Sequence, residues 1–275
     1  MKSVLWAALL LALSGCDPGG QTSELPERGQ VEVEVELARR MPAEAVALVG
    51  ATFAPDGKLY VLDSHSGLYE VGEKSATLVW NTTGLTGLEF TDVVALGSGR
   101  FAVTAENDGF LLDLPTQSLT SYFCYLPPIT QQPGVEPMSV SQTLALQGIP
   151  VKQRTESVAF NAESLQLFAQ PQTIRLDDGA VAGSELFVFG EAGGEPIQVT
   201  PLFEDSFLAG GMVALTGRLL LGERNTIWEA ANGEYWPLVA LDSAVDITGM
   251  TRGQNNEVWV LDAPGRRLLK VGGQL

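Results

Sequence analysis

The sequence predicts an all-β fold, and three observations lead to that prediction. From residue 31 onward the apolar residues show no convincing 3.6-residue periodicity, which argues against amphipathic helices. Short runs rich in Val, Leu and Phe alternate instead with Gly, Pro, Asn and Asp, which is the pattern of strands joined by tight turns. These runs also recur as a unit, so residues 31–275 are expected to form one repeated β domain.

The repeated unit is a pair of strands, in which the first strand ends at an acidic residue before a tight turn. Four copies lie at residues 58–71, 100–114, 218–229 and 257–271, and a fifth lies at 156–168. Further apolar runs precede these pairs, and their equivalent positions are taken as Phe53, Leu96, Phe160, Leu215 and Met250. The spacings of 43, 64, 55 and 35 residues, with three or four strands in each unit, predict a β-propeller.

The unequal spacing and the two ends of the domain bear on blade count and ring closure. The longest gap can hold an extra partial blade near residues 142–146 or 184–189, so five or six blades are expected. The last unit supplies about three strands, whereas residues 31–37 form an alternating Val/Glu strand without a hairpin partner. Pairing this strand into the last blade would close the ring and cover two exposed edges. A β-sandwich is the alternative, because short strands with Gly turns also suit it.

The N-terminal residues have the layout of an export signal. Lys2 is followed by a nearly unbroken apolar stretch over residues 4–12, which is too short for a bilayer span of about 20 residues. The stretch ends in Leu-Ser-Gly-Cys, with the cysteine at position 16, and here the sequence resembles the lipobox of bacterial lipoproteins. The alternatives are a chance Cys after an ordinary signal peptide and a buried N-terminal helix.

The lipobox resemblance implies cleavage before Cys16, a diacylglycerol on its thiol, and a further acyl chain such as palmitate on the new amino group. Several acyl chains together anchor a protein stably in a membrane. Three segments are therefore expected: a signal peptide at 1–15, the lipidated Cys16 with a Pro- and Gly-rich tether to residue 30, and a propeller at 31–275. The expected location is the bacterial cell envelope, with the domain facing the periplasm or the cell exterior. Cys124 would then lack a partner, and its apolar neighbours favour a buried position.

The internal repeats at residues 92–109, 156–168 and 248–262 resemble envelope β-propellers of the SdiA-regulated kind. More loosely, they are similar to the NHL-repeat and gluconolactonase-like propellers. The shared pattern is an acidic residue opening an inner strand, a small-apolar centre, a Gly turn and a strand ending near Glu or Asp. Where that family often has a Glu-Gly pair, this chain has Val93, Ser157 and Ile247 after the acids.

Three acidic residues are the candidate metal ligands. Inner propeller strands run in one sense along the channel, so Asp92, Glu156 and Asp246 near their starts are expected to converge at one mouth. Carboxylates gathered there could bind Ca²⁺, which could activate water for attack on a lactone or phosphoester. The alternative, which is favoured because no D-x-D-x-D loop is present, is that the acids accept backbone hydrogen bonds or only add charge. No cofactor is therefore assigned, and Ca²⁺ is the candidate if one binds.

Composition excludes several classes of function. The net charge of −17 leaves no basic surface for nucleic acid, and it becomes −18 if residues 1–15 and their one Lys are removed. Nucleotide, zinc and redox motifs are missing, and the one histidine, His65, lies in a polar turn with no Gly-x-Ser-x-Gly nucleophile to assist. No catalytic residue is assigned. The first hypothesis is a non-enzymatic envelope lipoprotein that binds a protein or glycan, and the alternative is a metal-dependent hydrolase of the gluconolactonase or phytase-like type.

Overall fold

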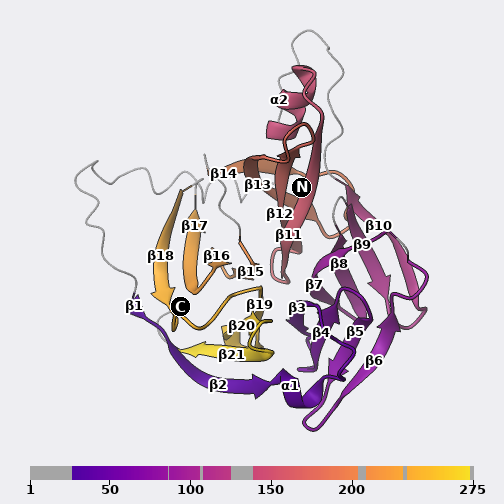
Figure 1. Ribbon diagram of the computed structural model, residues 1–275, viewed down its shortest axis with the longest axis vertical. Helices are drawn as coiled ribbons and strands as arrows, with labels where there is room; N and C mark the ends of the chain where they lie inside the picture. The colour runs from indigo at the N-terminus through magenta and orange to yellow at the C-terminus, as the bar shows by residue number, and fades with distance from the viewer. Residues whose placement is uncertain are drawn as a thin grey trace, which may run out of the picture.

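Five sheets surround a common centre, as the blades of a propeller do (Figure 1); four are four-stranded and antiparallel, and the fifth carries one additional parallel strand. This computed structural model describes residues 27–85, 87–105, 108–124, 139–203, 209–231 and 234–272. The sheets follow one another along the chain, so each blade is one repeat of the sequence. The all-β propeller prediction is confirmed, and the blade count is five.

Each blade is built from consecutive strands, which run from the centre outward. Blade one contains β3 (Leu48–Phe53), β4 (Leu59–Asp63), β5 (Gly67–Val71) and β6 (Ala76–Asn81). Blade two contains β7 (Phe90–Gly97), β8 (Arg100–Ala105), β9 (Asp108–Asp113) and β10 (Ser118–Cys124). Blade three contains β11 (Val151–Asn161), β12 (Gln166–Arg175), β13 (Val181–Gly190) and β14 (Gln198–Phe203). Blade four contains β15 (Gly211–Leu215), β16 (Arg218–Glu223), β17 (Thr226–Ala231) and β18 (Glu234–Ala240).

Blade five joins the two ends of the described chain. Its strands β19 (Gly249–Arg252), β20 (Val258–Asp262) and β21 (Arg267–Gly272) are completed by the N-terminal strand β2 (Gln30–Glu36). Strand β2 pairs antiparallel with β21, from Gln30 opposite Gly272 to Glu36 opposite Arg267, so the predicted ring closure is confirmed. The two-residue strand β1 (Glu27–Arg28) adds in parallel to the outer edge of blade four.

The alternation of β2 does not bury its valines as the sequence pattern suggests. Val31 and Val33 are 43% and 42% exposed, and only Val35 packs against the core. A register shift between Val31 and Val33 interrupts the alternation. The strand is therefore held mainly by its backbone ladder, with support from the ion pair of Lys270 with Glu32 at 3.1 Å.

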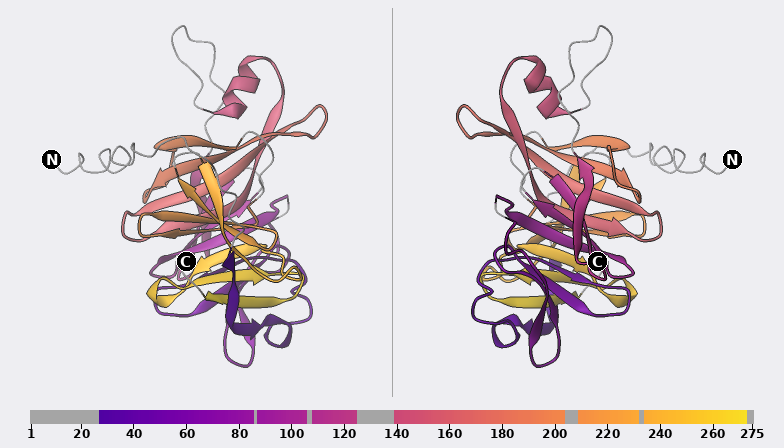
Figure 2. Two further views of the ribbon diagram at one scale, coloured as in Figure 1. Left: turned by 90° about the vertical axis from the view of Figure 1, so that its left-hand side faces the viewer. Right: turned by 90° about the vertical axis from the view of Figure 1, so that its right-hand side faces the viewer.

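The extra partial blade predicted near residues 142–146 or 184–189 is not present in the described part of the chain. Residues in the first candidate segment form helix α2 (Val140–Leu146), and residues 184–189 belong to β13 inside blade three. The strands β11, β12 and β13 have 10 or 11 residues, longer than those of the other blades, and they extend toward α2 (Figures 1 and 2). The gap is thus filled by one enlarged blade and its helix. A second short helix, α1 (Leu37–Arg40), follows β2, and among the described ranges no helix is both long and apolar enough to cross a bilayer.

The core lies between the blades, because each sheet packs both of its faces against neighbours. Strands β4 and β20 are buried along their whole length, including their terminal acids Asp63 and Asp262. Asp63 accepts hydrogen bonds from the N–H groups of Ala47 and Ser66 at 2.6 and 2.8 Å, and Asp262 accepts one from Gly265 at 3.1 Å. These acids form the turns after their strands, as the repeat predicted.

Two pairs of neighbouring inner strands lie very close together near the residues where the strands begin. We call that side of the ring the upstream face and the side where the inner strands end the downstream face. A Cβ on Gly211 would lie 2.4 Å from the backbone of Gly249, and one on Gly50 would lie 2.4 Å from Asp92 Oδ1. Such distances admit glycine alone, so β15 approaches β19, and β3 approaches β7, in direct contact near the upstream face.

Candidate functional site

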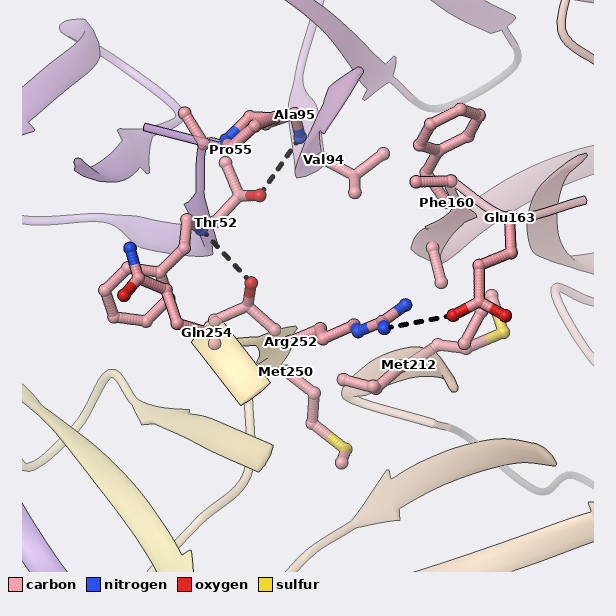
Figure 3. A pocket seen from close by; sticks show the side chains of 18 residues that line it. Thr52, Pro55, Val94, Ala95, Phe160, Glu163, Met212, Met250, Arg252 and Gln254 are labelled. Carbon is pink, nitrogen blue, oxygen red and sulfur yellow. Dashed lines mark hydrogen bonds and ion pairs between the residues drawn. The ribbon is translucent and has the colours of Figure 1, made fainter. Parts of the chain in front are cut away.

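A pocket of about 280 Å³ opens at the downstream end of the central channel (Figure 3). All five inner strands contribute to its walls, so every blade takes part in shaping it. Its apolar walls include Val94, Met212 and Met250, of which the two methionines are almost fully buried. A pocket that rests on the inner strands of a closed ring is held rigidly, because its walls cannot move without disturbing the blades.

One structurally equivalent residue from each blade faces this pocket. On every inner strand it is the residue paired with the first apolar residue of the second strand, and these residues are Phe53, Ala95, Phe160, Ala214 and Arg252. The equivalence taken from the sequence was right for Phe53 and Phe160, one residue late at Leu96 and Leu215, and two residues early at Met250. The corrected alignment shows a ring of four apolar residues and a single arginine.

Arg252 and Glu163 are the charged residues among those that line the pocket. The Arg252 Nη2 atom lies 3.5 Å from Glu163 Oε1, across the mouth from the end of β19 to the turn after β11 (Figure 3). Each partner has one further contact. Thr216 donates a hydrogen bond to Glu163 Oε1 at 2.8 Å, and Arg252 donates one to Asn256 Oδ1. Two further residues therefore position the pair, although the Arg252 and Glu163 side chains remain 28% and 53% exposed.

Hydrogen bonds between neighbouring inner strands stiffen the pocket walls. Thr52 Oγ1 accepts a hydrogen bond from the N–H of Ala95 at 3.0 Å, which ties blade one to blade two. Thr251 Oγ1 accepts one from the N–H of Phe53 at 3.3 Å, which ties blade five to blade one. Inner strands of different blades have no shared β ladder, so these side chains satisfy backbone donors that would otherwise be left unpaired.

Asp92 makes an equivalent contact between blades two and three. Its Oδ2 atom accepts a hydrogen bond from the Val158 N–H at 2.9 Å, and its Oδ1 atom accepts one from the Val93 N–H at 2.8 Å. The carboxyl is 1% exposed, and this burial raises its pKa well above the usual value, although the two hydrogen bonds lower it. Asp92 thus lies inside the ring and accepts backbone hydrogen bonds, as the alternative to a metal site expected.

The structure does not bring Asp92 together with the two other candidate metal ligands. Glu156 is the extra residue at a bulge of β11 and pairs with Arg154 at 3.1 Å, while Asp246 is exposed in the connection before β19. Burial raises the pKa of Glu156, an effect that Arg154 opposes and Glu89 reinforces. Within the described ranges, no three His, Cys, Asp or Glu side chains are grouped as a metal ion requires. The predicted convergence fails because the acids are not at equivalent positions: Asp92, Glu156 and Asp246 lie three, four and six residues before the pocket-facing residues of their blades.

The remaining sequence predictions fall elsewhere. Cys16, the signal peptide and most of the tether lie outside the described residues, and of the expected tether Glu27 and Arg28 form β1. Cys124 ends β10 and is exposed, so the expectation that it is buried was wrong. His65 is exposed in the turn after β4, on the upstream face and away from the pocket.

A second group of buried polar side chains lies between blade three and α2. Glu185 Oε1 accepts a hydrogen bond from the Val140 N–H at 2.8 Å, and this bond seats the helix on β13. The Glu185 side chain is fully buried, and burial raises its pKa to about 7 against the opposing effect of that hydrogen bond. The hydroxyls of Thr155 and Thr173 are also buried, with no hydrogen-bond partner among the described residues.

Comparisons with known proteins identify solved structures with a similar fold. No protein-family model matches the chain, and no curated protein matches it. A glutaminyl cyclase from Myxococcus xanthus aligns with a TM-score of 0.51 at 12% identity, over 90% of this chain and 97% of that one. A provisionally assigned gluconolactonase aligns with a TM-score of 0.51 at 12% identity, over 87% of this chain and 81% of that one.

A third solved structure is much longer than this chain. It is the extracellular domain of a provisionally assigned one-component system from B. thetaiotaomicron, matched with a TM-score of 0.43 at 12% identity. The match covers 83% of this chain but 27% of the other. At such identities, the likeness to the first two structures shows the propeller fold and nothing about the chemistry of the site.

The pocket residues could have been found from the sequence by a different alignment of the repeats. The strand-ending acids Asp63 and Asp262 occupy equivalent buried positions, and counting back from them places Arg252 opposite Phe53. Arginine at a position that is apolar in the other blades is the signal that the earlier alignment on Met250 concealed.

Proposed function

We propose that this protein is a lipid-anchored envelope protein whose propeller is a non-enzymatic binding domain, with the downstream pocket as its binding site. The anchor is inferred from the sequence: the short apolar stretch before Cys16 and the lipobox pattern that ends there. The binding role is inferred from the pocket. Its location at the centre of five blades makes it a pre-formed concave site, which is where ligands are usually bound.

The chemistry of the pocket favours binding over catalysis. Among the described residues, the lining contains no His, Cys, Ser or Lys, and its one carboxylate is paired with Arg252. A nucleophile needs an adjacent base that activates it, and the recorded partners of Glu163 are two donors, Thr216 and Arg252. The observation that carries the proposal is this apolar pocket with one fixed ion pair at its rim.

Capture from solubilised envelope tests the binding role. Ala162 is exposed at the pocket, so Ala162→Phe should obstruct the mouth without disturbing the core. The matched control is Ala180→Phe, at an exposed position of the β12–β13 hairpin outside the pocket lining. We expect the same envelope component to be recovered with the unmodified protein and with Ala180→Phe, and to be lost with Ala162→Phe. Equal recovery by all three would contradict the proposal.

The alternative of a metal-dependent hydrolase makes a different prediction. If carboxylates on this chain held Ca²⁺, adding the ion would raise the melting temperature, and Glu156→Gln combined with Asp246→Asn would abolish the rise. We expect no Ca²⁺-dependent shift in either protein. A shift lost in the double variant, together with turnover of a lactone or phosphoester and no captured partner, would replace the binding role with hydrolysis.

Membrane fractionation tests the anchor. Cys16→Ala removes the thiol that would carry the lipid, so the variant should move from the membrane fraction to the soluble fraction. Incorporation of a labelled palmitate analogue should be lost in parallel. A Cys16→Ala protein that stays in the membrane fraction would show that the lipobox interpretation is wrong.

A further inference from the structure

The ion pair at the pocket mouth uses only part of its hydrogen-bonding capacity. Both recorded contacts of the Glu163 carboxylate, from Thr216 and from Arg252, reach the same oxygen, Oε1. Both contacts of the Arg252 guanidinium, to Glu163 and to Asn256, leave from the same nitrogen, Nη2. Within the described part of the chain, Glu163 Oε2 and Arg252 Nε and Nη1 have no recorded partner. One anionic acceptor and two cationic donors are therefore available at the pocket mouth.

The space next to these charges is apolar and small. Met212 and Phe160 lie beside Glu163, whereas Met250 points away from the ion pair (Figure 3) and packs in the core next to Gly222. Unbranched thioethers adapt to apolar groups of different shapes. The pocket volume of about 280 Å³ is slightly smaller than the volumes of pockets for drug-sized ligands, which are about 300–1,000 Å³. The occupant should therefore be a small molecule with one apolar group and a charged end.

The charged end should carry both signs. A ligand with only an ammonium or only a carboxylate would engage one member of the pair and compete with the other for it. In an α-amino acid the ammonium and the carboxylate are attached to one carbon, so one molecule can present a donor to Glu163 and an acceptor to Arg252 at the same time. A net charge of −17 also disfavours a purely anionic ligand.

We propose that the downstream pocket binds a free α-amino acid with an apolar side chain, of the size of leucine, methionine or phenylalanine. The α-ammonium group donates to Glu163 Oε2, and the α-carboxylate accepts from Arg252 Nη1. The side chain enters the apolar space beside Met212 and Phe160. This inference rests on the proposed function, since it names the ligand class of the same pocket.

Calorimetric titration of the folded domain with L-leucine tests the inference. Two analogues each remove one charge: 4-methylpentanoate lacks the ammonium group, and isopentylamine lacks the carboxylate. We expect saturable binding of leucine, with both analogues weaker by about tenfold or more, which is the effect of losing about 1.4 kcal/mol. Glycine, which has no side chain to bury, should bind more weakly than leucine by a similar factor.

Matched variants assign the two charges. Glu163→Gln should weaken leucine binding and abolish its advantage over 4-methylpentanoate, whereas Arg252→Gln should abolish its advantage over isopentylamine. The control is a second ion pair, Arg218 with Glu229 at 2.6 Å on β16 and β17, whose residues do not line the pocket. Arg218→Gln and Glu229→Gln should bind leucine as the unmodified protein does. Melting temperatures of all four variants establish that they are folded.

Three outcomes would overturn the inference: no saturable binding of leucine, analogues that bind as tightly as leucine, or glycine binding as tightly as leucine. Failure here is distinguishable from failure of the proposed function. If Ala162→Phe abolishes capture of an envelope partner while leucine does not bind, the binding role stands and the amino-acid ligand is rejected. If neither capture nor leucine binding depends on Ala162, both are rejected.

Discussion

The Asp92 carboxylate accepts the backbone N–H of Val158 at 2.9 Å, and this bond joins the inner strands of blades two and three. The same carboxylate also accepts the N–H of Val93. Neighbouring inner strands have no shared ladder, so a single side chain takes the place of backbone pairing across this blade boundary. Thr52 and Thr251 do the same at two other boundaries of the ring.

Removing the Asp92 carboxylate should destabilise the fold strongly. In Asp92→Ala both N–H groups are left buried without an acceptor, and in Asp92→Asn the amide NH₂ faces one of them as a second donor. We expect either change to lower the free energy of unfolding by about 3 kcal/mol, measured by urea denaturation. The control Asp246→Asn, at an exposed position, should change it by less than about 0.5 kcal/mol. A loss below 1 kcal/mol in Asp92→Ala, roughly the net value of one ordinary hydrogen bond, would contradict the role assigned to Asp92.

Two glycine substitutions should have opposite effects. Gly211→Ala places a Cβ 2.4 Å from the backbone of Gly249, where no flexible group can move aside. We expect it to destabilise the protein by roughly 3 kcal/mol or to prevent folding, because overpacking of this kind shifts the backbone of two blades. At Gly190 a Cβ would meet nothing within 4 Å, so Gly190→Ala should be neutral or stabilise by up to about 1 kcal/mol. Thermal denaturation compares the two, and equal melting temperatures would refute the close approach of β15 and β19.

Stability should depend on the protonation of Glu185. Its pKa is about 7 in the folded protein against an ordinary value of 4.5, so the folded state holds the proton over a pH range in which the unfolded state has lost it. Its contribution to stability is therefore fully present below about pH 4.5 and is lost as the pH rises to about 7. The loss is on the order of 3 kcal/mol, from the size of the pKa shift.

Glu185→Gln should remove this pH dependence. The amide oxygen can still accept the Val140 N–H, so the seat of α2 is preserved while the titratable group is lost. We expect the variant to be more stable than the unmodified protein at pH 8 and closer to it at pH 5, as measured by urea denaturation at both values. The control is Glu163→Gln. It should change the difference in unfolding free energy between pH 5 and pH 8 by less than Glu185→Gln does. Identical pH profiles for Glu185→Gln and the unmodified protein would contradict the prediction.

Loss of β2 should open the ring. A chain beginning at residue 37 lacks the strand that pairs with β21, and it exposes the N–H and C=O groups along that edge. We expect a clearly lower melting temperature and concentration-dependent association through the free edge, seen by light scattering. A chain beginning at residue 27 retains β1 and β2 and should not associate through this edge. Equal melting temperatures for the two chains would show that the closure contributes little.

The repeat predicted the fold because its signals are local. A strand, an acid-ended turn and a second strand recur within about 15 residues, and the acids Asp63 and Asp262 form those turns by bonding nearby N–H groups. Helix α2 also had a local signal that was overlooked. Ser139 accepts a hydrogen bond from the N–H of Gln142, which is the Ser-x-x-Gln pattern of a helix start.

The site could not be predicted in the same way, because it depends on how five strands meet in space. Asp92 lies within β7, three residues before Ala95, and is buried, whereas Asp246 lies six residues before Arg252, outside β19, and is exposed. The sequence pattern alone did not show that the two acids occupy different positions in their blades. The two charged residues at the pocket rim, Glu163 and Arg252, are 89 residues apart in the sequence. They meet because blades three and five both border the central channel.

The N-terminal strands also determine how the domain would respond to tension. A force applied at Glu27 is carried first by β1, which pairs with Val239 and Ala240 alone, and only afterwards by the longer ladder between β2 and β21. The two ladders are loaded in series, so the short one yields first and lengthens the chain before any strain reaches blade five. The pairing of β1 with β18 should therefore separate under tension before the pairing of β2 with β21, so the ring and its pocket stay intact.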